Sequence, residues 1–183
     1  MFQFPPIPSW DAWHPMIIHF PIALLLIAPV FILLGALLVP ARGRPYLMAA
    51  MALLLLGTAG TFVAVETGEA AAQIAERAPG VEQVIETHES LAERTRAVFS
   101  VLSVIFFALL AGPQFLKKTD SRLTTTILPL AFLILYSAGI LLLVNTAHNG
   151  GRLVHEYGVK AMVGAPAADT NAAVPLETEH EKD

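Results

Sequence analysis

Four long apolar runs divide the chain, at about residues 16–39, 46–65, 97–116 and 123–147. Each run is close to the ~20 residues that an α-helix needs to cross the hydrocarbon core of a bilayer. No Asp, Glu, Lys or Arg interrupts any of the four runs. The pattern predicts an all-α integral membrane protein, with residues 1–160 forming one four-span helical bundle.

Basic residues gather in two of the connections between these runs. Residues 40–45 carry two arginines, and residues 117–122 carry three basic residues against one acid. The segment before the first run has no Lys or Arg. Because short loops rich in Lys and Arg stay in the cytoplasm, we expect both loops inside. In a bacterial inner membrane, both termini and the middle segment then lie on the periplasmic side.

The segment between the second and third runs has a helical pattern of its own. After a break at Pro79 and Gly80, apolar residues and one histidine recur at the three-and-four spacing of one helical face. We expect a short extracytoplasmic helical segment here that continues into the third span. Residues 161–183 are small, polar and acidic, which predicts a disordered acidic tail. We recognise no convincing internal repeat in the sequence.

Composition agrees with a membrane protein and excludes several classes of site. Only 14% of the residues are charged, against about a quarter in soluble domains, and the mean hydropathy is +0.63. The net charge of −4 argues against a nucleic-acid partner. The absence of cysteine excludes disulfides, thiolate metal sites, iron–sulfur clusters and covalent c-type haem attachment.

Histidines are the chemical feature of the chain, and five of the six border the membrane spans. With four spans, all five fall on the same side of the membrane, whichever way the chain is oriented. Imidazole at the edge of hydrocarbon usually faces the bundle interior and marks a functional site. It is also the commonest nitrogen ligand of metals and haem. The five residues are His14, His19, His88, His148 and His155.

Haem b suits this chain because haem brings four nitrogens of its own, so that two histidines complete the iron site. A bundle rich in Leu, Phe and Ala also offers an apolar setting for the macrocycle. We expect His19, His88 and His148 as first-choice iron ligands, with His14 next and His155 last. Residues five apart lie about 140° apart around a helix. His14 and His19 therefore cannot reach one iron from a regular helix, and one or two haems both remain open.

Each of these residues also has a structural interpretation. The histidines could bond to backbone carbonyls or sit in an interfacial belt. The small residues Gly57, Gly60, Ser137 and Gly139 could let a flat macrocycle approach the backbone or could serve ordinary helix packing. Glu66 ends the second run, where it could orient a ligand imidazole, relay a proton, bind metal or cap the next helix. A His/Glu site without haem would hold copper, zinc or non-haem iron. No HExxH motif is present, and no residue set indicates catalysis of its own.

The run HPMIIHFPIAL at residues 14–24 resembles the opening motif of a bacterial family of predicted membrane proteins, the domain of unknown function 2231 family. ETGE at residues 66–69, HE at 88–89 and GGRLV at 150–154 are similar to its later sections. The resemblance implies a four-helix membrane domain suspected of haem binding and respiratory electron transfer. The family pattern tends to have Tyr where His155 stands, which makes His155 the least favoured ligand.

Together these features predict a membrane b-type cytochrome-like electron carrier, or a subunit of a redox complex, with haem near the periplasmic face. Its expected partners are the lipid bilayer, a quinol and a periplasmic electron-transfer protein or other subunits. The first alternative is a membrane protein with a bare His/Glu metal site. The second is a structural subunit of a larger membrane complex.

Overall fold

The computed structural model describes residues 7–75, 80–115 and 121–159, and these contain helices and no strand. Four helical segments are long and apolar enough to cross a membrane, which confirms the predicted all-α fold with four candidate spans. The elements are η1 (Asp11–Trp13), α1 (His14–Ile17), α2 (His19–Leu37), α3 (Pro40–Ala75), α4 (Glu82–Phe115), η2 (Leu123–Ile127) and α5 (Leu128–His155).

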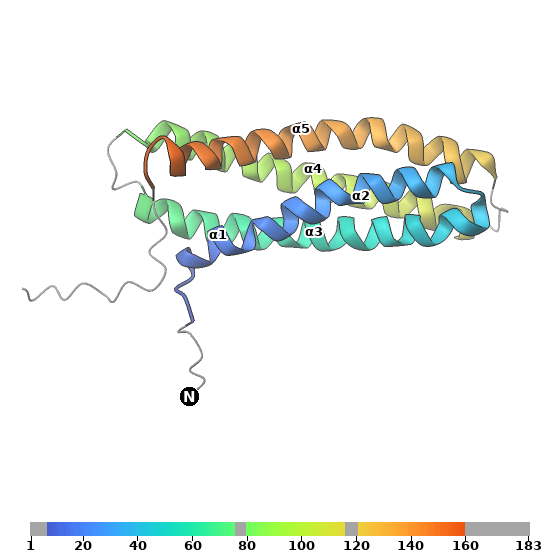
Figure 1. The fold of residues 1–183 in the computed structure, drawn as a ribbon, viewed down its shortest axis with the longest axis horizontal. Helices are drawn as coiled ribbons and strands as arrows, with labels where there is room; N and C mark the ends of the chain where they lie inside the picture. The colour runs from blue at the N-terminus through green and yellow to red at the C-terminus, as the bar shows by residue number, and fades with distance from the viewer. Residues whose placement is uncertain (1–6, 76–79, 116–120, 160–183) are drawn as a thin grey trace, which may run out of the picture.

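The helices run antiparallel in one bundle (Figure 1). α2 packs against α3 and α5, and α4 packs against the same two helices, so the order around the bundle is α2, α3, α4, α5. The short α1 packs against α3 and its own neighbours in the chain. We call the end that holds α1, the last turns of α3 and α5 and the first turns of α4 the histidine end.

The segment between the second and third apolar runs belongs to the long helices themselves. α3 continues to Ala75, well past its apolar run, and α4 begins at Glu82 and continues unbroken into the third span. The predicted continuity of the outer helix with the third span is therefore confirmed, whereas a separate extracytoplasmic helical segment is not shown. The expected break at Pro79 and the acidic tail at 161–183 fall outside the described residues.

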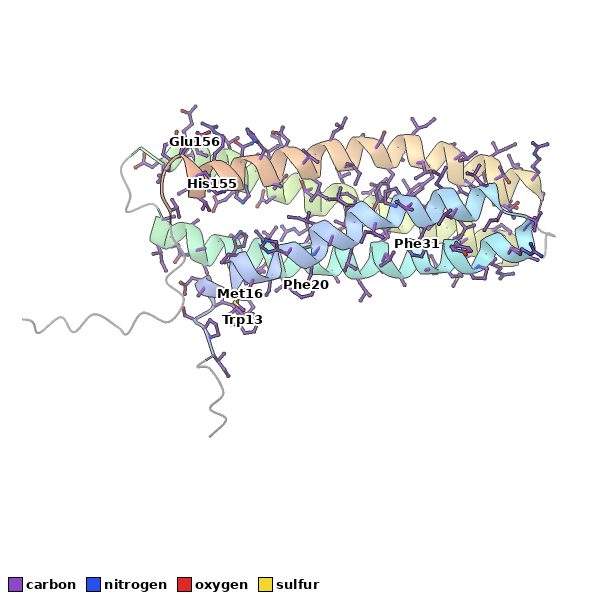
Figure 2. All side chains as sticks on the ribbon, viewed as in Figure 1. Trp13, Met16, Phe20, Phe31, His155 and Glu156 are labelled. Carbon is purple, nitrogen blue, oxygen red and sulfur yellow. The ribbon has the colours of Figure 1, made fainter. Side chains whose placement is uncertain are left out.

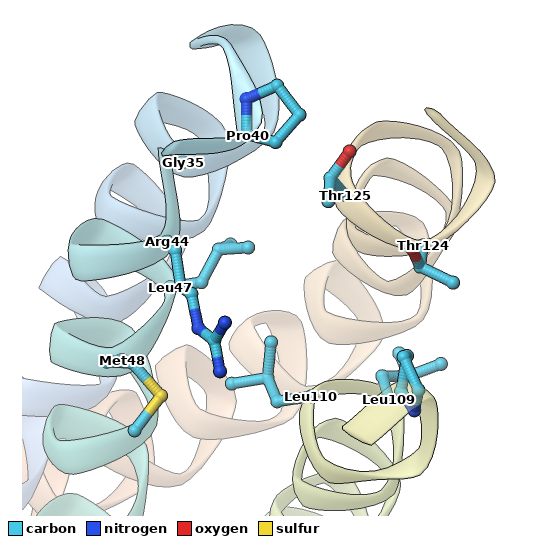
Figure 3. A pocket seen from close by; sticks show the side chains of 10 residues that line it. Gly35, Pro40, Arg44, Leu47, Met48, Leu109, Leu110, Thr124 and Thr125 are labelled. Carbon is cyan, nitrogen blue, oxygen red and sulfur yellow. The ribbon is translucent and has the colours of Figure 1, made fainter. Parts of the chain in front are cut away.

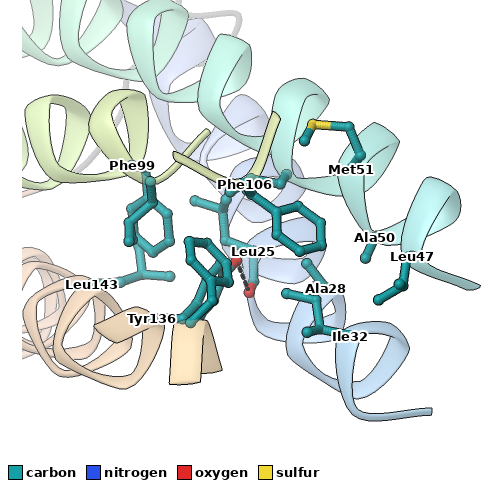
Figure 4. Close-up of a cluster of buried hydrophobic side chains, with 13 residues drawn as sticks. Leu25, Ala28, Ile32, Leu47, Ala50, Met51, Phe99, Phe106, Tyr136 and Leu143 are labelled. Atoms are coloured by element: carbon teal, nitrogen blue, oxygen red, sulfur yellow. Dashed lines mark hydrogen bonds between the residues drawn. The ribbon is translucent and has the colours of Figure 1, made fainter. Parts of the chain in front are cut away.

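Aromatic and aliphatic side chains fill the centre of the bundle (Figure 4). Phe106 stacks on Phe132 with ring centroids 4.8 Å apart, and Phe99 meets Tyr136 edge-on at 5.5 Å. The outward faces are apolar as well, and Ile134 is 77% exposed. Soluble proteins rarely leave so much contiguous apolar surface bare, so this surface is the one that lipid would cover. Figure 2 shows Phe20 projecting outward in the same way.

A proline inside α2 is compensated by a tyrosine from α5. Pro29 has no N–H, so the carbonyl of Leu25, four residues earlier, loses its helical donor. The buried Tyr136 hydroxyl donates to that carbonyl at 2.8 Å (Figure 4). Neighbouring side chains are the usual way in which membrane helices satisfy a carbonyl freed by proline.

Small and hydroxylated residues join the helices elsewhere. A Cβ on Gly57 would lie 2.8 Å from the Leu25 side chain, and one on Gly139 would lie 2.9 Å from Leu102. These glycines therefore serve close helix packing, one of the two interpretations that the sequence left open. Thr58 and Ser103 share a hydrogen bond of 2.9 Å between α3 and α4.

Replacing Tyr136 by Phe should lower the free energy of unfolding by about 1 kcal/mol, because the Leu25 carbonyl would be left buried without a donor. The measurement is thermal unfolding in detergent, followed by circular dichroism. Ser137→Ala is the matched control, since Ser137 is exposed and donates only to Ile134 in its own helix. Equal stability of Tyr136→Phe and wild type would contradict the assignment.

Candidate cofactor site

His14 and His88 meet across the histidine end of the bundle. Their ring centroids are 6.4 Å apart, and the ring planes are nearly perpendicular at 82°. His14 is the first residue of α1, and His88 lies in the second turn of α4. Both side chains are partly buried. Two residues far apart in the sequence thus present their imidazoles to the same space.

Each imidazole is held by a backbone carbonyl of a neighbouring helix. His14 Nδ1–H donates to the Ala64 carbonyl of α3 at 2.9 Å, and His88 Nδ1–H donates to the Thr146 carbonyl of α5 at 3.0 Å. Because a carbonyl oxygen only accepts, Nδ1 carries the proton and Nε2 keeps its lone pair. This arrangement is the one that orients histidine as a ligand through Nε2.

A hydroxyl gives His14 a second anchor. Thr67 Oγ1 lies 3.3 Å from His14 Nδ1, and its own proton goes to the Val63 carbonyl at 2.8 Å. The Thr67 oxygen is therefore free to accept from the same N–H. Thr67 is fully buried, so water cannot replace this contact.

A glycine underlies each imidazole. A Cβ at Gly68 would lie 3.0 Å from His14 Cε1, and a Cβ at Gly150 would lie 2.9 Å from His88 Cε1. Gly68 follows Ala64 by four residues, as Gly150 follows Thr146, so each glycine is one helical turn beyond the accepting carbonyl. The missing side chains let the rings lie directly on the helix backbone.

The two imidazoles line a cavity of about 850 Å³. This volume is within the range of cofactor and small-molecule sites, about 300–1,000 Å³. Its walls come from α1, α2, α3, α4 and α5, mostly with Ala, Gly, Ile and Val side chains. Four acidic residues also line it: Asp11, Glu69, Glu89 and Glu93. At the opposite end, Arg44 and Leu110 line a much smaller pocket of about 40 Å³ (Figure 3), which is room for little more than water.

The other predicted residues occupy different positions. His19 and His155 line the cavity, but both side chains are exposed; Figure 2 labels His155 at the end of α5. His148 is exposed and does not line the cavity. Glu66 is also outside the cavity, and its carboxylate lies 3.9 Å from the Arg96 guanidinium.

Helix geometry explains why Glu66 and His148 lie outside the cavity. Glu66 lies two residues after Ala64, and His148 lies two residues after Thr146. Two residues correspond to about 200° of rotation around a helix. Both side chains therefore project from the face opposite the carbonyls that hold His14 and His88.

The separation of the two imidazoles would allow both to bind one metal centre. A metal–imidazole bond is about 2 Å long, and the two ring centroids lie 6.4 Å apart. Among the residues that the structure describes, no group of three His, Cys, Asp or Glu side chains could hold a metal ion. The donor set thus suits a cofactor that brings most of its own ligands.

Comparison with known proteins gives one match. The family described as "Predicted membrane protein (DUF2231)" matches residues 11–162. No curated protein and no solved structure matches the chain. The comparison supports a membrane protein and leaves the chemistry of the site to be argued from its residues.

The burial of the histidines predicts their order of chemical modification. Diethyl pyrocarbonate should modify the exposed His148 and His155 before the partly buried, hydrogen-bonded His14 and His88. Peptide mass spectrometry of the detergent-solubilised protein at increasing reagent dose measures this order. Modification of His14 as rapid as that of His148 would show that the His14 anchor is absent.

Proposed function

The chain belongs to the domain of unknown function 2231 family of predicted membrane proteins, and because that name assigns no activity, we propose a function from the site itself. The protein is a membrane b-type cytochrome-like electron carrier, or the haem-bearing subunit of a redox complex. It holds haem b between His14 and His88. The observation that carries the proposal is the pair of facing imidazoles, each with Nδ1–H bonded to a carbonyl.

The residues present fit haem better than a bare ion. Haem supplies four nitrogen ligands and one-electron iron chemistry when bound, and two imidazoles are what it requires of the protein. Zinc sites usually take three or four protein ligands, and the described residues do not gather three. The apolar part of the cavity wall suits a macrocycle.

The chain's own groups tune such a site. The Ala64 and Thr146 carbonyls fix the tautomer and orientation of the two imidazoles and raise their basicity as ligands. The buried Thr67 hydroxyl adds to this effect on the His14 side. No described residue near the imidazoles forms a nucleophile–base pair, so electron transfer is a better account of the site than bond-making chemistry.

Basic residues support an orientation for this carrier. Arg42 and Arg44 lie in the first turns of α3, at the end of the bundle opposite the imidazoles. With that end in the cytoplasm of a bacterium, the histidine end and both termini face the periplasm. A quinol in the bilayer is then the proposed electron donor, and a periplasmic protein or another subunit is the acceptor.

The proposal predicts the optical spectrum. Protein made with ample haem should show a Soret band that sharpens on dithionite reduction, with α and β bands of low-spin haem b. His14→Ala and His88→Ala should each abolish the low-spin bands, because each removes one of the two imidazoles that would hold the haem. His148→Ala is the matched control and should leave the spectrum unchanged, because His148 is exposed and outside the cavity.

A featureless spectrum of the wild-type protein would refute the cytochrome proposal. Metal analysis then separates the alternatives. Copper, zinc or iron bound stoichiometrically and lost in both histidine variants would indicate a bare-metal site. Absence of metal and haem would leave the structural-subunit interpretation.

A further inference from the structure

The two half-sites around the cavity have the same construction. In each, a histidine on the first helix of an antiparallel pair donates to a carbonyl on the second helix, with a glycine four residues later against the ring. The first half-site consists of His14, Ala64 and Gly68, and the second of His88, Thr146 and Gly150. The sequence separations of the two hydrogen-bonded pairs are similar, at 50 and 58 residues.

The correspondence extends to other residues of the cavity wall. On the first helices, the shift in residue number that relates His14 to His88 also relates other lining residues to each other. Asp11, Pro15, Ile18 and His19 correspond in this way to Ile85, Glu89, Ala92 and Glu93. On the second helices, the shift that carries Gly68 onto Gly150 does the same: Val65, Glu69, Ala71 and Ala72 fall on Ala147, Gly151, Leu153 and Val154.

The same two shifts relate the packed core. Ten of the sixteen buried residues of α2 and α3 fall on buried positions of α4 and α5, although the side chains differ greatly in size. On the first helices, Pro21, Leu25, Ala28 and Ile32 correspond to Thr95, Phe99, Leu102 and Phe106. On the second helices, Leu47, Ala50, Leu54, Gly57, Thr61 and Thr67 correspond to Pro129, Phe132, Tyr136, Gly139, Leu143 and Asn149.

Because the helices are ordered α2, α3, α4, α5 around the bundle, a rotation relates the two halves of the repeat. In this order, a half-turn about the long axis of the bundle exchanges the places of α2 and α4 and those of α3 and α5. His14, which precedes α2 in the first pair of helices, then corresponds to His88 near the start of the second pair. A ligand that binds both imidazoles must lie between the two half-sites.

We propose that the chain forms one symmetric site per molecule, between two equivalent half-sites, and that Gly68 and Gly150 are its positioning residues. This inference rests on the proposed function, since the macrocycle that it names is haem, whose two faces offer equivalent axial positions. The inference predicts one haem per molecule and not two. Within the described residues, His14 and His88 are the histidine pair in ring contact.

The glycines act through the imidazoles. A Cβ at Gly68 or Gly150 would lie about 3 Å from Cε1 of the neighbouring ring, so the ring must shift from the position in which it donates to its carbonyl. A shifted imidazole would hold haem less well while its partner stays in place. Gly112 of α4 provides a control, because a Cβ there meets nothing within 4 Å and Gly112 does not line the cavity.

The test compares Gly68→Ala, Gly150→Ala and Gly112→Ala in the full-length protein titrated with hemin in detergent. Haem per chain, the low-spin fraction by optical and electron paramagnetic resonance spectroscopy, and helix content by circular dichroism are measured. Wild type and Gly112→Ala should bind one low-spin haem. Gly68→Ala and Gly150→Ala should each weaken haem binding to a similar extent, by about tenfold or more, as for loss of a group that orients a metal ligand, with unchanged helix content.

Variants that replace each histidine by glycine provide a second test that the two half-sites are equivalent. His14→Gly and His88→Gly should both recover a low-spin spectrum when free imidazole is added, since each leaves room for the ligand that it removes. Two haems per chain, or glycine variants that bind haem like wild type, would overturn the inference and leave the proposed function standing. A wild-type chain that binds no haem would overturn both.

Discussion

Backbone hydrogen bonding without water governs this fold. In the core of a bilayer every N–H and C=O must find a partner within the protein. The Tyr136 hydroxyl supplies one to the Leu25 carbonyl that Pro29 leaves without a donor. The same rule applies to the histidines, whose N–H groups need acceptors at the edge of the hydrocarbon. Helix carbonyls, which have a second lone pair, provide them.

This rule gives the imidazoles their chemical character. A histidine that donates Nδ1–H to a carbonyl is neutral, fixed in orientation and directed outward through Nε2. His14 and His88 satisfy these conditions on opposite walls of one cavity. The hydrogen bond that satisfies the Nδ1–H of each imidazole in an apolar setting also orients Nε2 as a ligand atom.

The sequence predicted what depends on long periodic patterns. The four apolar runs gave the spans, and their even number placed five histidines at one end of the bundle. Which histidines meet depends on the rotation of each helix about its own axis, and apolar runs specify this poorly because lipid-facing and buried residues are equally hydrophobic. For that reason His148 was ranked above His14, although the structure directs it away from the cavity.

The internal repeat was hidden for a related reason. Corresponding positions in the two halves can both be buried and still carry side chains of different size. Ala50 corresponds to Phe132, and Leu54 corresponds to Tyr136. Few identities survive between the halves, and the informative ones are single residues such as His14 and His88 or Gly68 and Gly150. Only the bonds from imidazole to carbonyl reveal that these residues correspond.

The contact between Tyr136 and Leu25 has a consequence for the order in which the protein is made. The α2–α3 hairpin is complete in the growing chain long before residue 136 is synthesised. Until α5 arrives, the Leu25 carbonyl has no donor from the finished fold, although its helix already lies in the apolar run that enters the membrane first. The first hairpin is thus an incomplete unit, and the insertion of the last helix supplies the hydrogen bond that completes it.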